Sequence, residues 1–458
     1  MTFYFLNIKI LNGNFVRKFF YLLIPFLISL QCSKIDPDKK IIAILSLNSQ
    51  TKISYSKSSY EWIRGVQIQE EKPNILRLNP ANNDSNFQYT VTPNFPQGII
   101  LDKQTGIISG RPELAVIPKK YTVQVSNNSE TQFILLDITV YGYLPLKTYQ
   151  STCSNNTGTT ISCSQTGQDA DLQMGREADF NRPEAYSDYP NDYVTKDNAT
   201  GLIWKTCPDG QSGSNCSDGS SNLVDWDSAQ SLCKQLDSVN SNNGFAGLKN
   251  WRTPTREELI SMATSIGSGI SVSSTYFPNS NWMAWTSMEI NTLNAFRSSS
   301  SLIGSITKAT ASPVRCVTGK YYPDSAFKDN GDGTITDYST KLVWQKCAIG
   351  QIGDSCESSA TGMNRNNALN ACNSLSLANK IWRLPNYTEL LSILKANQIS
   401  QAIDSQFFPN NPTNSFWSST NYPLSGIAAN NVNFSSGSSS NVIKTGTTVY
   451  TRCVANMN

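Results

Sequence analysis

The sequence has no histidine among its 458 residues. Histidine is the side chain most often used as a general base near neutral pH, and it is the commonest metal ligand. Charged residues are also scarce, at 16 % of the chain, whereas soluble domains average about 25 %. The chain therefore lacks the residue most often used for acid–base catalysis and metal binding, and we expect neither a metal nor a cofactor.

Familiar catalytic and nucleotide-binding motifs are missing as well. The chain has no Gly-x-Ser-x-Gly nucleophile elbow, no phosphate-binding P-loop and no dinucleotide fingerprint. A zinc site made of four thiolates needs cysteines two to four residues apart, but even the first three cysteines of each repeat lie nine and then sixteen or seventeen positions apart. We expect that the protein is not an enzyme.

The first residues have the layout of a signal peptide. Lys9, Arg17 and Lys18 precede an apolar run at 19–30, which is too short for the ~20 residues of a membrane-spanning helix. Cys32 follows almost directly and resembles the cysteine of a bacterial lipobox, although Leu30 and Gln31 are bulkier than the usual small residues. An ordinary signal peptide with an incidental Cys32, or an uncleaved anchor, are the alternatives. We expect a signal peptide at 1–31, a lipidated tether at 32–50, and a place in the cell envelope, at the outer membrane surface.

Cleavage after residue 31 changes both the charge and the cysteine count. It leaves 34 basic and 34 acidic residues, since the leader holds three of the 37 basic ones and no acidic one. A neutral chain has no general attraction to nucleic acid, so we expect no such partner. If Cys32 carries a lipid, ten cysteines remain, and in an oxidising compartment they are expected to pair.

Residues 51–143 read as short β-strands. Apolar and polar residues alternate at 121–125 and 133–140, and Gly/Pro turns separate the runs. One motif of this region resembles the Ig-like domains of bacterial surface proteins. It consists of Phe95-Pro96-x-Gly98, then Thr105-Gly106 and Ile108-Ser109-Gly110-x-Pro112. That resemblance implies a β-sandwich that serves as a spacer. A cadherin-like calcium site using Asp102 and Asp137 is the alternative.

The rest of the chain is a duplication, with copies at about 193–317 and 333–454 whose offset stays between 131 and 140. This is the repeat of a whole domain. In the first copy the shared positions are Trp204, Cys207, Cys216, Cys233, Trp251-Arg252, Pro254, Glu258-Leu259, Phe277-Pro278, Trp285 and Arg315-Cys316-Val317. In the second they are Trp344, Cys347, Cys356, Cys372, Trp382-Arg383, Pro385, Glu389-Leu390, Phe408-Pro409, Trp417 and Arg452-Cys453-Val454.

Each copy predicts two helices and a closing strand. Asp225 and Asn364 are expected to cap the first helix, and a capping box opens the second at Thr255/Glu258 and Asn386/Glu389. The second helix of each copy is expected to face the core with its apolar positions, which are 259, 262, 263 and 266 in the first copy and 390, 393 and 394 in the second. The closing strands are predicted at 314–317 and 450–454. Glu258 and Glu389 could instead be acid catalysts, but capping explains both, and we expect Arg252 and Arg383 to pair inside the domain.

The four cysteines of each copy allow three connectivities. We expect the first pair to close a Gly/Ser-rich loop and the second to join the first helix to the final strand. The expected disulfides are Cys153–Cys163, Cys207–Cys216, Cys233–Cys316, Cys347–Cys356 and Cys372–Cys453.

The Trp-x-x-Cys, Trp-Arg-x-Pro-x-x-x-Glu-Leu and Arg-Cys-Val pattern resembles the Lcl C-terminal domain family of bacterial surface proteins. The resemblance implies an α+β fold like that of C-type lectins, related to formylglycine-generating enzymes. For its named member it implies binding of sulfated host polysaccharide, although the neutral mature chain lacks the basic excess such polymers favour. The expected fold class is an all-β Ig-like sandwich at 51–143 followed by two α+β domains. The expected division is a linker at 144–164, repeat 1 at 165–319 and repeat 2 at 320–458.

Two stretches resemble cation-binding loops. Residues 329–337 hold Asp and Gly near EF-hand spacing, but Lys328 stands where the first ligand is needed. The Asn-Gly and Asp-Gly pairs indicate a hairpin turn instead. For residues 166–171 we prefer an exposed linker to a metal loop.

The function predicted from these features is recognition. We expect an exported lipoprotein that adheres to host matrix protein or glycan, with Trp285 and Trp417 as a possible ligand surface for sugar stacking. An envelope structural or assembly protein without a host ligand is the alternative, and an unrecognised enzyme on the formylglycine-generating fold is a more remote one.

The lipid anchor can be tested by metabolic labelling. Cells that express the chain and receive radiolabelled palmitate should label the wild type, because a lipobox cysteine carries acyl chains. Cys32→Ala should remain unlabelled. Equal labelling of Cys32→Ala, or no labelling of the wild type, would reject lipidation at this residue.

Overall fold

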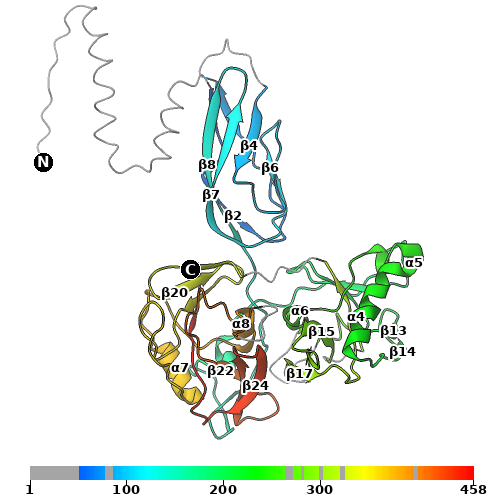
Figure 1. The fold of residues 1–458 in the computed structure, drawn as a ribbon, viewed down its shortest axis with the longest axis vertical. Helices are drawn as coiled ribbons and strands as arrows, with labels where there is room; N and C mark the ends of the chain where they lie inside the picture. The colour runs from blue at the N-terminus through cyan, green and yellow to red at the C-terminus, as the bar shows by residue number, and fades with distance from the viewer. Residues whose placement is uncertain are drawn as a thin grey trace, which may run out of the picture.

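The computed structural model describes residues 51–77, 86–263, 272–279, 283–298, 303–319, 325–395 and 401–457. The predicted signal peptide, tether and Cys32 lie outside these ranges, as does residue 266. The described chain forms an Ig-like domain that stands over two side-by-side copies of the repeated domain (Figure 1). Within the described ranges, none of the helices has the length and apolar character needed to cross a bilayer.

The N-terminal domain is a β-sandwich, as predicted. Its strands are β1 (Thr51–Ser54), β2 (Ser59–Ile63), β3 (Asn74–Arg77), β4 (Gln88–Thr92), β5 (Ile99–Leu101), β6 (Ile108–Gly110), β7 (Val116–Ser126) and β8 (Thr131–Tyr141). The main sheet has the order β2-β8-β7-β4, with β2 parallel to β8. Alternation along β7 buries Tyr121, Val123 and Val125. Asp102 accepts hydrogen bonds from the backbone N–H groups of residues 104 and 105, so its carboxylate fixes a turn.

Copy one contains β11 (Val194–Lys196), β12 (Ile203–Lys205), β13 (Gln211–Ser212), β14 (Asp218–Gly219), α4 (Trp226–Gln235), η2 (Leu236–Ser238), α5 (Val239–Asn242), η3 (Phe245–Gly247), α6 (Arg256–Met262), β15 (Trp285–Glu289), β16 (Asn294–Ser298), β17 (Ile303–Thr307) and β18 (Val317–Thr318). Copy two contains β19 (Phe327–Asp329), β20 (Thr334–Asp337), β21 (Leu342–Gln345), α7 (Arg365–Asn373), α8 (Tyr387–Ser392), β22 (Ser415–Asn421), β23 (Ala428–Asn433), β24 (Ser438–Ile443) and β25 (Val454–Asn456). Sheet β15-β16-β17 corresponds to β22-β23-β24, so the duplication holds in three dimensions.

The helix caps follow the sequence prediction. Asp225 and Asn364 cap α4 and α7, and both capping boxes form at the starts of α6 and α8. The predicted core positions of the second helices that are described are buried. The closing strands are shifted, because β18 begins at Val317 and β25 at Val454. Residues 314–316 and 450–453 lead into these strands instead of forming them.

All five expected disulfides are present. Cys207–Cys216 and Cys347–Cys356 close the small loops, and Cys233–Cys316 and Cys372–Cys453 join the first helix of each copy to the C-terminal end of that copy. Cys153–Cys163 completes the set. The two long bridges span 83 and 81 residues. In the chain-entropy model, loops of this length give the larger stabilisation, about 4 kcal/mol each.

Glu258 and Glu389 hold the repeated domain together from within. Each carboxylate accepts from the backbone N–H of its N-cap residue and also binds an arginine with both oxygens. The Arg252–Glu258 contacts are 2.6 and 2.5 Å, and both Arg383–Glu389 contacts are 2.6 Å. The Trp-Arg-x-Pro and Glu-Leu motifs are therefore two halves of one interaction, and the internal arginine pairing is confirmed.

The two copies share one hydrophobic core. Equivalent elements face each other across the junction, with α6 against α8 and β17 against β24 (Figure 1). Leu259 and Phe296 of copy one join Leu390 and Phe416 of copy two in one continuous buried cluster. Arg256 NH1 donates to the Gly437 carbonyl at 2.5 Å across the same junction. The copies thus form an internal pseudo-dimer of the kind that an isologous interface would give.

The predicted linker is wrong in its place and its boundary. Residues 144–178, called the strap below, precede copy one but pack on copy two. The strap holds β9 (Cys153–Ser154), β10 (Thr160–Ile161) and α3 (Asp169–Leu172). Gln150 exchanges hydrogen bonds with the backbone of Asn421, and Lys444 Nζ donates to Ser154 Oγ at 2.6 Å. The first residues assigned to repeat 1 therefore complete repeat 2.

The predictions for the two loops that resemble cation sites differ in outcome, since one is confirmed and the other is wrong. Residues 329–335 form the β19–β20 hairpin, which confirms the turn prediction. Residues 166–171 are not an exposed linker, because Gln168 and Asp169 are buried against copy two. The hydroxyls of Thr148 and Thr420 donate to the Asp169 carboxylate, so this side chain anchors the strap.

The Ig-like domain is fixed to copy two. Gly142 N donates to the Tyr338 carbonyl at 2.8 Å, and Tyr141 stacks on Tyr338 with ring centroids 5.7 Å apart. A Cβ on Gly142 would lie 2.0 Å from the Ser339 carbonyl oxygen. Only glycine therefore allows this approach of the two backbones.

Glu389→Gln should destabilise copy two more than Glu258→Gln destabilises copy one. The first change leaves Arg383, 7 % exposed, without its charge partner, and breaking such a buried pair costs about 3–5 kcal/mol. Arg252 is 32 % exposed, so water can solvate it after the matched change. Hydrogen exchange of the α6 and α8 amides measures both losses. Equal losses in the two helices would contradict this account.

The strap anchor predicts a pH dependence of stability. Burial raises the pKa of Asp169 from 3.8 to about 6. A raised folded-state pKa gives stability that is complete below pH 3.8 and is lost as the pH rises through 6, by at most about 3 kcal/mol. Between pH 4 and pH 7 the unfolding free energy of the wild type should therefore fall relative to that of Asp169→Asn. Urea denaturation at several pH values checks this, with the exposed Asp354→Asn as control. A constant difference between wild type and Asp169→Asn would refute it.

Candidate functional site

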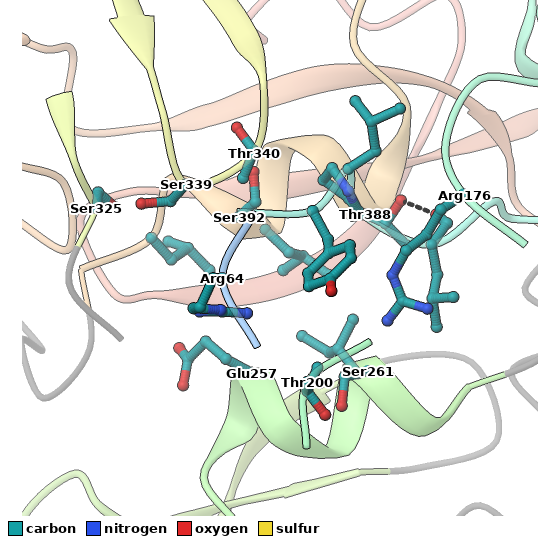
Figure 2. Close-up of a pocket in the computed structure, with 17 residues that line it drawn as sticks. Arg64, Arg176, Thr200, Glu257, Ser261, Ser325, Ser339, Thr340, Thr388 and Ser392 are labelled. Atoms are coloured by element: carbon teal, nitrogen blue, oxygen red, sulfur yellow. Dashed lines mark hydrogen bonds between the residues drawn. The ribbon is translucent and has the colours of Figure 1, made fainter. Parts of the chain in front are cut away.

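A cleft lies where the Ig-like domain, the strap and both copies meet. Its volume is about 160 Å³, and residues of all four parts line it. This is below the roughly 300–1,000 Å³ of pockets for drug-sized ligands, so the junction cleft fits a group about the size of one sugar ring. Figure 2 shows the lining side chains.

The floor of the junction cleft is built from equivalent residues of the two copies. Ile260 and Ser261 on α6 correspond to Leu391 and Ser392 on α8, and all four line the cleft. Their positions follow the glutamate of the capping box by two and three residues, so the paired Arg–Glu interactions set where these side chains lie. The cleft is therefore a product of the duplication.

A second matched pair comes from two turns. Thr200 and Thr340 line the cleft, and each ends an Asp-x-x-Thr turn, at 197–200 and 337–340. Asp197 Oδ1 accepts from the backbone N–H of Thr200 at 3.2 Å, and Asp337 Oδ2 accepts from the Thr340 hydroxyl at 2.6 Å. Burial raises the pKa of Asp337 to about 6. Both carboxylates are fully buried supports of the threonines.

Arginines and one glutamate charge the walls. Arg64 of the Ig-like domain and Glu257 of α6 lie at one end, and Arg176 of the strap lies at the other (Figure 2). Arg176 NH2 lies 3.8 Å from Asp197 Oδ2. Burial raises the pKa of Asp197, and Arg176 partly offsets this effect. Glu257 Oε1 accepts from Arg256, while its buried Oε2 finds no hydrogen-bond partner among the described residues.

Several hydroxyls that line the cleft donate their protons to backbone carbonyls of the protein, so their lone pairs remain for a ligand. Ser261 donates to the Glu258 carbonyl and Ser392 to the Glu389 carbonyl, both at 2.7 Å. Thr388 donates to the strap carbonyl of Leu146 at 2.6 Å (Figure 2). A hydroxyl whose proton is used still accepts two hydrogen bonds. The cleft thus offers acceptors to a ligand's hydroxyls and guanidinium donors to its oxygens.

The predicted ligand surface at Trp285 and Trp417 is wrong. Both indoles are 0 % exposed, and their Nε1 atoms donate to the carbonyls of Val224 and Met363 at 2.8 and 2.7 Å. Each packs beside the long disulfide of its own copy. The strand that follows each tryptophan faces the core, so these residues stabilise the domain and cannot stack on a sugar.

Sequence reasoning missed the residues that do line the cleft. Thr200/Thr340 and Ser261/Ser392 recur in the duplicated pattern beside residues that cap or pack. The sequence signal that could have found them is a polar residue that recurs at equivalent positions of both copies although it neither caps a helix nor belongs to the core. Arg64 and Arg176 had no such signal, because only the folded strap and domain junction bring them here.

The model of the Lcl C-terminal domain family matches residues 193–318 and 333–455, which together are more than half of the chain. The chain belongs to this family. A second family model, Putative Ig domain, matches residues 45–141. Both resemblances found in the sequence are therefore confirmed, as are an Ig-like domain and two following domains. A search of curated proteins returned no match.

Several solved structures are remote likenesses of parts of the chain. The chain covers 20 % and 25 % of two Bacteroides fragilis structures of the alpha-galactosidase type. A SusE-like surface located polysaccharide binding protein from Bacteroides thetaiotaomicron is 13 % identical over 33 % of this chain and 28 % of that one, with a TM-score of 0.17. Drosophila N-cadherin EC1-4 is 13 % identical over 33 % and 40 %, also with a TM-score of 0.17. Scores this low carry no argument about function.

Proposed function

We propose that this chain is an exported envelope lipoprotein that binds a glycan, with one acidic sugar ring seated in the junction cleft. The observation that carries the proposal is the cleft itself, where two arginines and paired hydroxyls converge at a domain junction. Small-ligand sites favour such junctions, with a few placed polar groups on a partly apolar lining. Ile260 and Leu391 supply the apolar part of the floor.

The charges favour one negative group on the ligand. Two arginines, 64 and 176, and one carboxylate, that of Glu257, line the cleft, so basic side chains outnumber acidic ones in its described lining. A guanidinium binds a carboxylate or a sulfate through two parallel hydrogen bonds. The chain as a whole is near neutrality, so attraction for an acidic glycan would come from this cleft and not from a broad basic surface.

The proposal includes no enzyme activity. Ten cysteines form disulfides, namely those at 153, 163, 207, 216, 233, 316, 347, 356, 372 and 453. None of these ten is a free thiol for the chemistry of formylglycine-generating relatives. Lipid anchoring and outer-membrane exposure belong to the same proposal, in which the Ig-like domain holds the two copies away from the membrane.

The test is calorimetric titration with hyaluronan and heparin hexasaccharides, which carry acidic groups as carboxylates alone or with sulfates. Ser261→Tyr should weaken binding by about tenfold or more, because the phenol fills the cleft. Its equivalent Ser392→Tyr should act alike, since both serines border the same space.

Ser231→Tyr is the matched control, because this serine is exposed on helix α4. It should bind like the wild type. If neither hexasaccharide binds, or if the two cleft variants bind normally, glycan recognition at the cleft is rejected. The structural or assembly alternative would then take its place.

A further inference from the structure

A groove separate from the junction cleft crosses copy two. It consists of two adjoining hollows of about 550 and 380 Å³, which share the wall formed by Asn410, Pro412 and Thr413. Both volumes lie within the range of built ligand sites. One hollow is lined by residues that include Gln401, Ile403, Ser405 and 434–435, and the other by residues that include 356–360. None of these residues lines the junction cleft.

The shared wall, residues 410–414, is held rigidly from both sides. Asn410 Nδ2 donates to the Ser355 carbonyl at 2.8 Å, and Gln351 donates to the Asn410 carbonyl at 2.9 Å. These contacts tie the wall to the Cys347–Cys356 loop. On the other side the buried Arg452 donates to Asn411 Oδ1 at 2.8 Å. A wall fixed before a ligand arrives loses little conformational entropy on binding.

Copy one repeats the anchor. Asn279 corresponds to Asn410, and its Nδ2 donates to the Cys216 carbonyl at 2.9 Å. Gln211 and Gln351 each donate to the second cysteine of the small loop, at 3.1 and 3.0 Å. The nine-residue disulfide loop therefore has a use beyond its own stability, because it positions the segment after Phe-Pro-Asn.

The lining of the groove selects the class of ligand. It contains hydroxyl and amide side chains, two prolines, Tyr450 and apolar residues such as Ile403, and no lysine or arginine is among its described lining residues. Glu357 is the charged residue among the described lining residues, and its carboxylate would repel an acidic polymer. Tyr450 is partly buried, while Thr413 is exposed on the wall between the hollows. Apolar ring and proline faces beside hydroxyls and amides suit the C–H faces and hydroxyl edges of sugars.

We propose that this groove binds a neutral, uncharged hexopyranose chain, with consecutive rings on either side of the 410–414 wall. The inference does not rest on the junction cleft, which is charged, is sized for one ring and is built from other residues. It gives copy two a binding surface of its own. A chain ligand fits because the two hollows share the lining residues Asn410, Pro412 and Thr413 and each is larger than the junction cleft.

The test titrates the full exported chain with maltoheptaose, cellohexaose and chitohexaose. At least one should bind, and Thr413→Trp should weaken that binding about tenfold or more, since the indole would cover the wall. Thr413→Ser should bind like the wild type. Thr447→Trp, at an exposed threonine of copy two outside the groove, controls for the bulk of the indole.

The outcomes separate this site from the cleft. Ser261→Tyr should leave binding of the neutral chain intact, and Thr413→Trp should leave binding of the acidic hexasaccharides intact. If none of the three neutral oligosaccharides binds the wild type, or if Thr413→Trp binds them normally while folded as judged by its disulfides and hydrogen exchange, the groove is not a glycan site.

Discussion

The structure depends most on the apolar core that the two copies share. Residues of α6 and of α8 belong to one buried cluster, so neither copy has a complete core alone. Separating them would expose apolar surface that is worth about 25 cal/mol per Å². Because equivalent helices face each other, equivalent side chains border the space between them, and this is how a duplication creates a cleft with matched serines and threonines.

The two copies are matched in backbone but not in every side chain. At the first helical position after the cap, copy one has Arg256, which bonds across to Gly437, while copy two has Tyr387, whose hydroxyl bonds Ser439. The first helix shows a similar divergence: Trp226 packs under Lys308 in copy one, whereas Arg365 is buried near Lys444 in copy two. Lys444 is held by the strap, so the strap fits copy two and not copy one.

Most of the local structure could be predicted from sequence, because it rests on short-range rules. Caps, capping boxes, the β19–β20 hairpin and the disulfide pairs follow from residue types at fixed spacings. The caps, the capping boxes and four of the five disulfides occur in both copies, whereas the hairpin and Cys153–Cys163 occur once. The strap could not be predicted, because its contacts with Asn421 and Lys444 join positions some 270–290 residues apart. The tryptophans misled for a related reason: an aromatic before Ser and Thr looks exposed until the strand's buried face is known.

The asymmetry also indicates how the copies divide their roles. Copy two receives the strap, the contact with the Ig-like domain through Tyr338, and the groove beside the Cys347–Cys356 loop. Copy one contributes α6, a wall of the cleft and half of the core. A duplicated domain that keeps the shared core but attaches most of the additional contacts to one copy is free to vary the other. The matched residues of the junction cleft are then the positions where neither copy can change alone, because each side of the cleft is shaped against its counterpart.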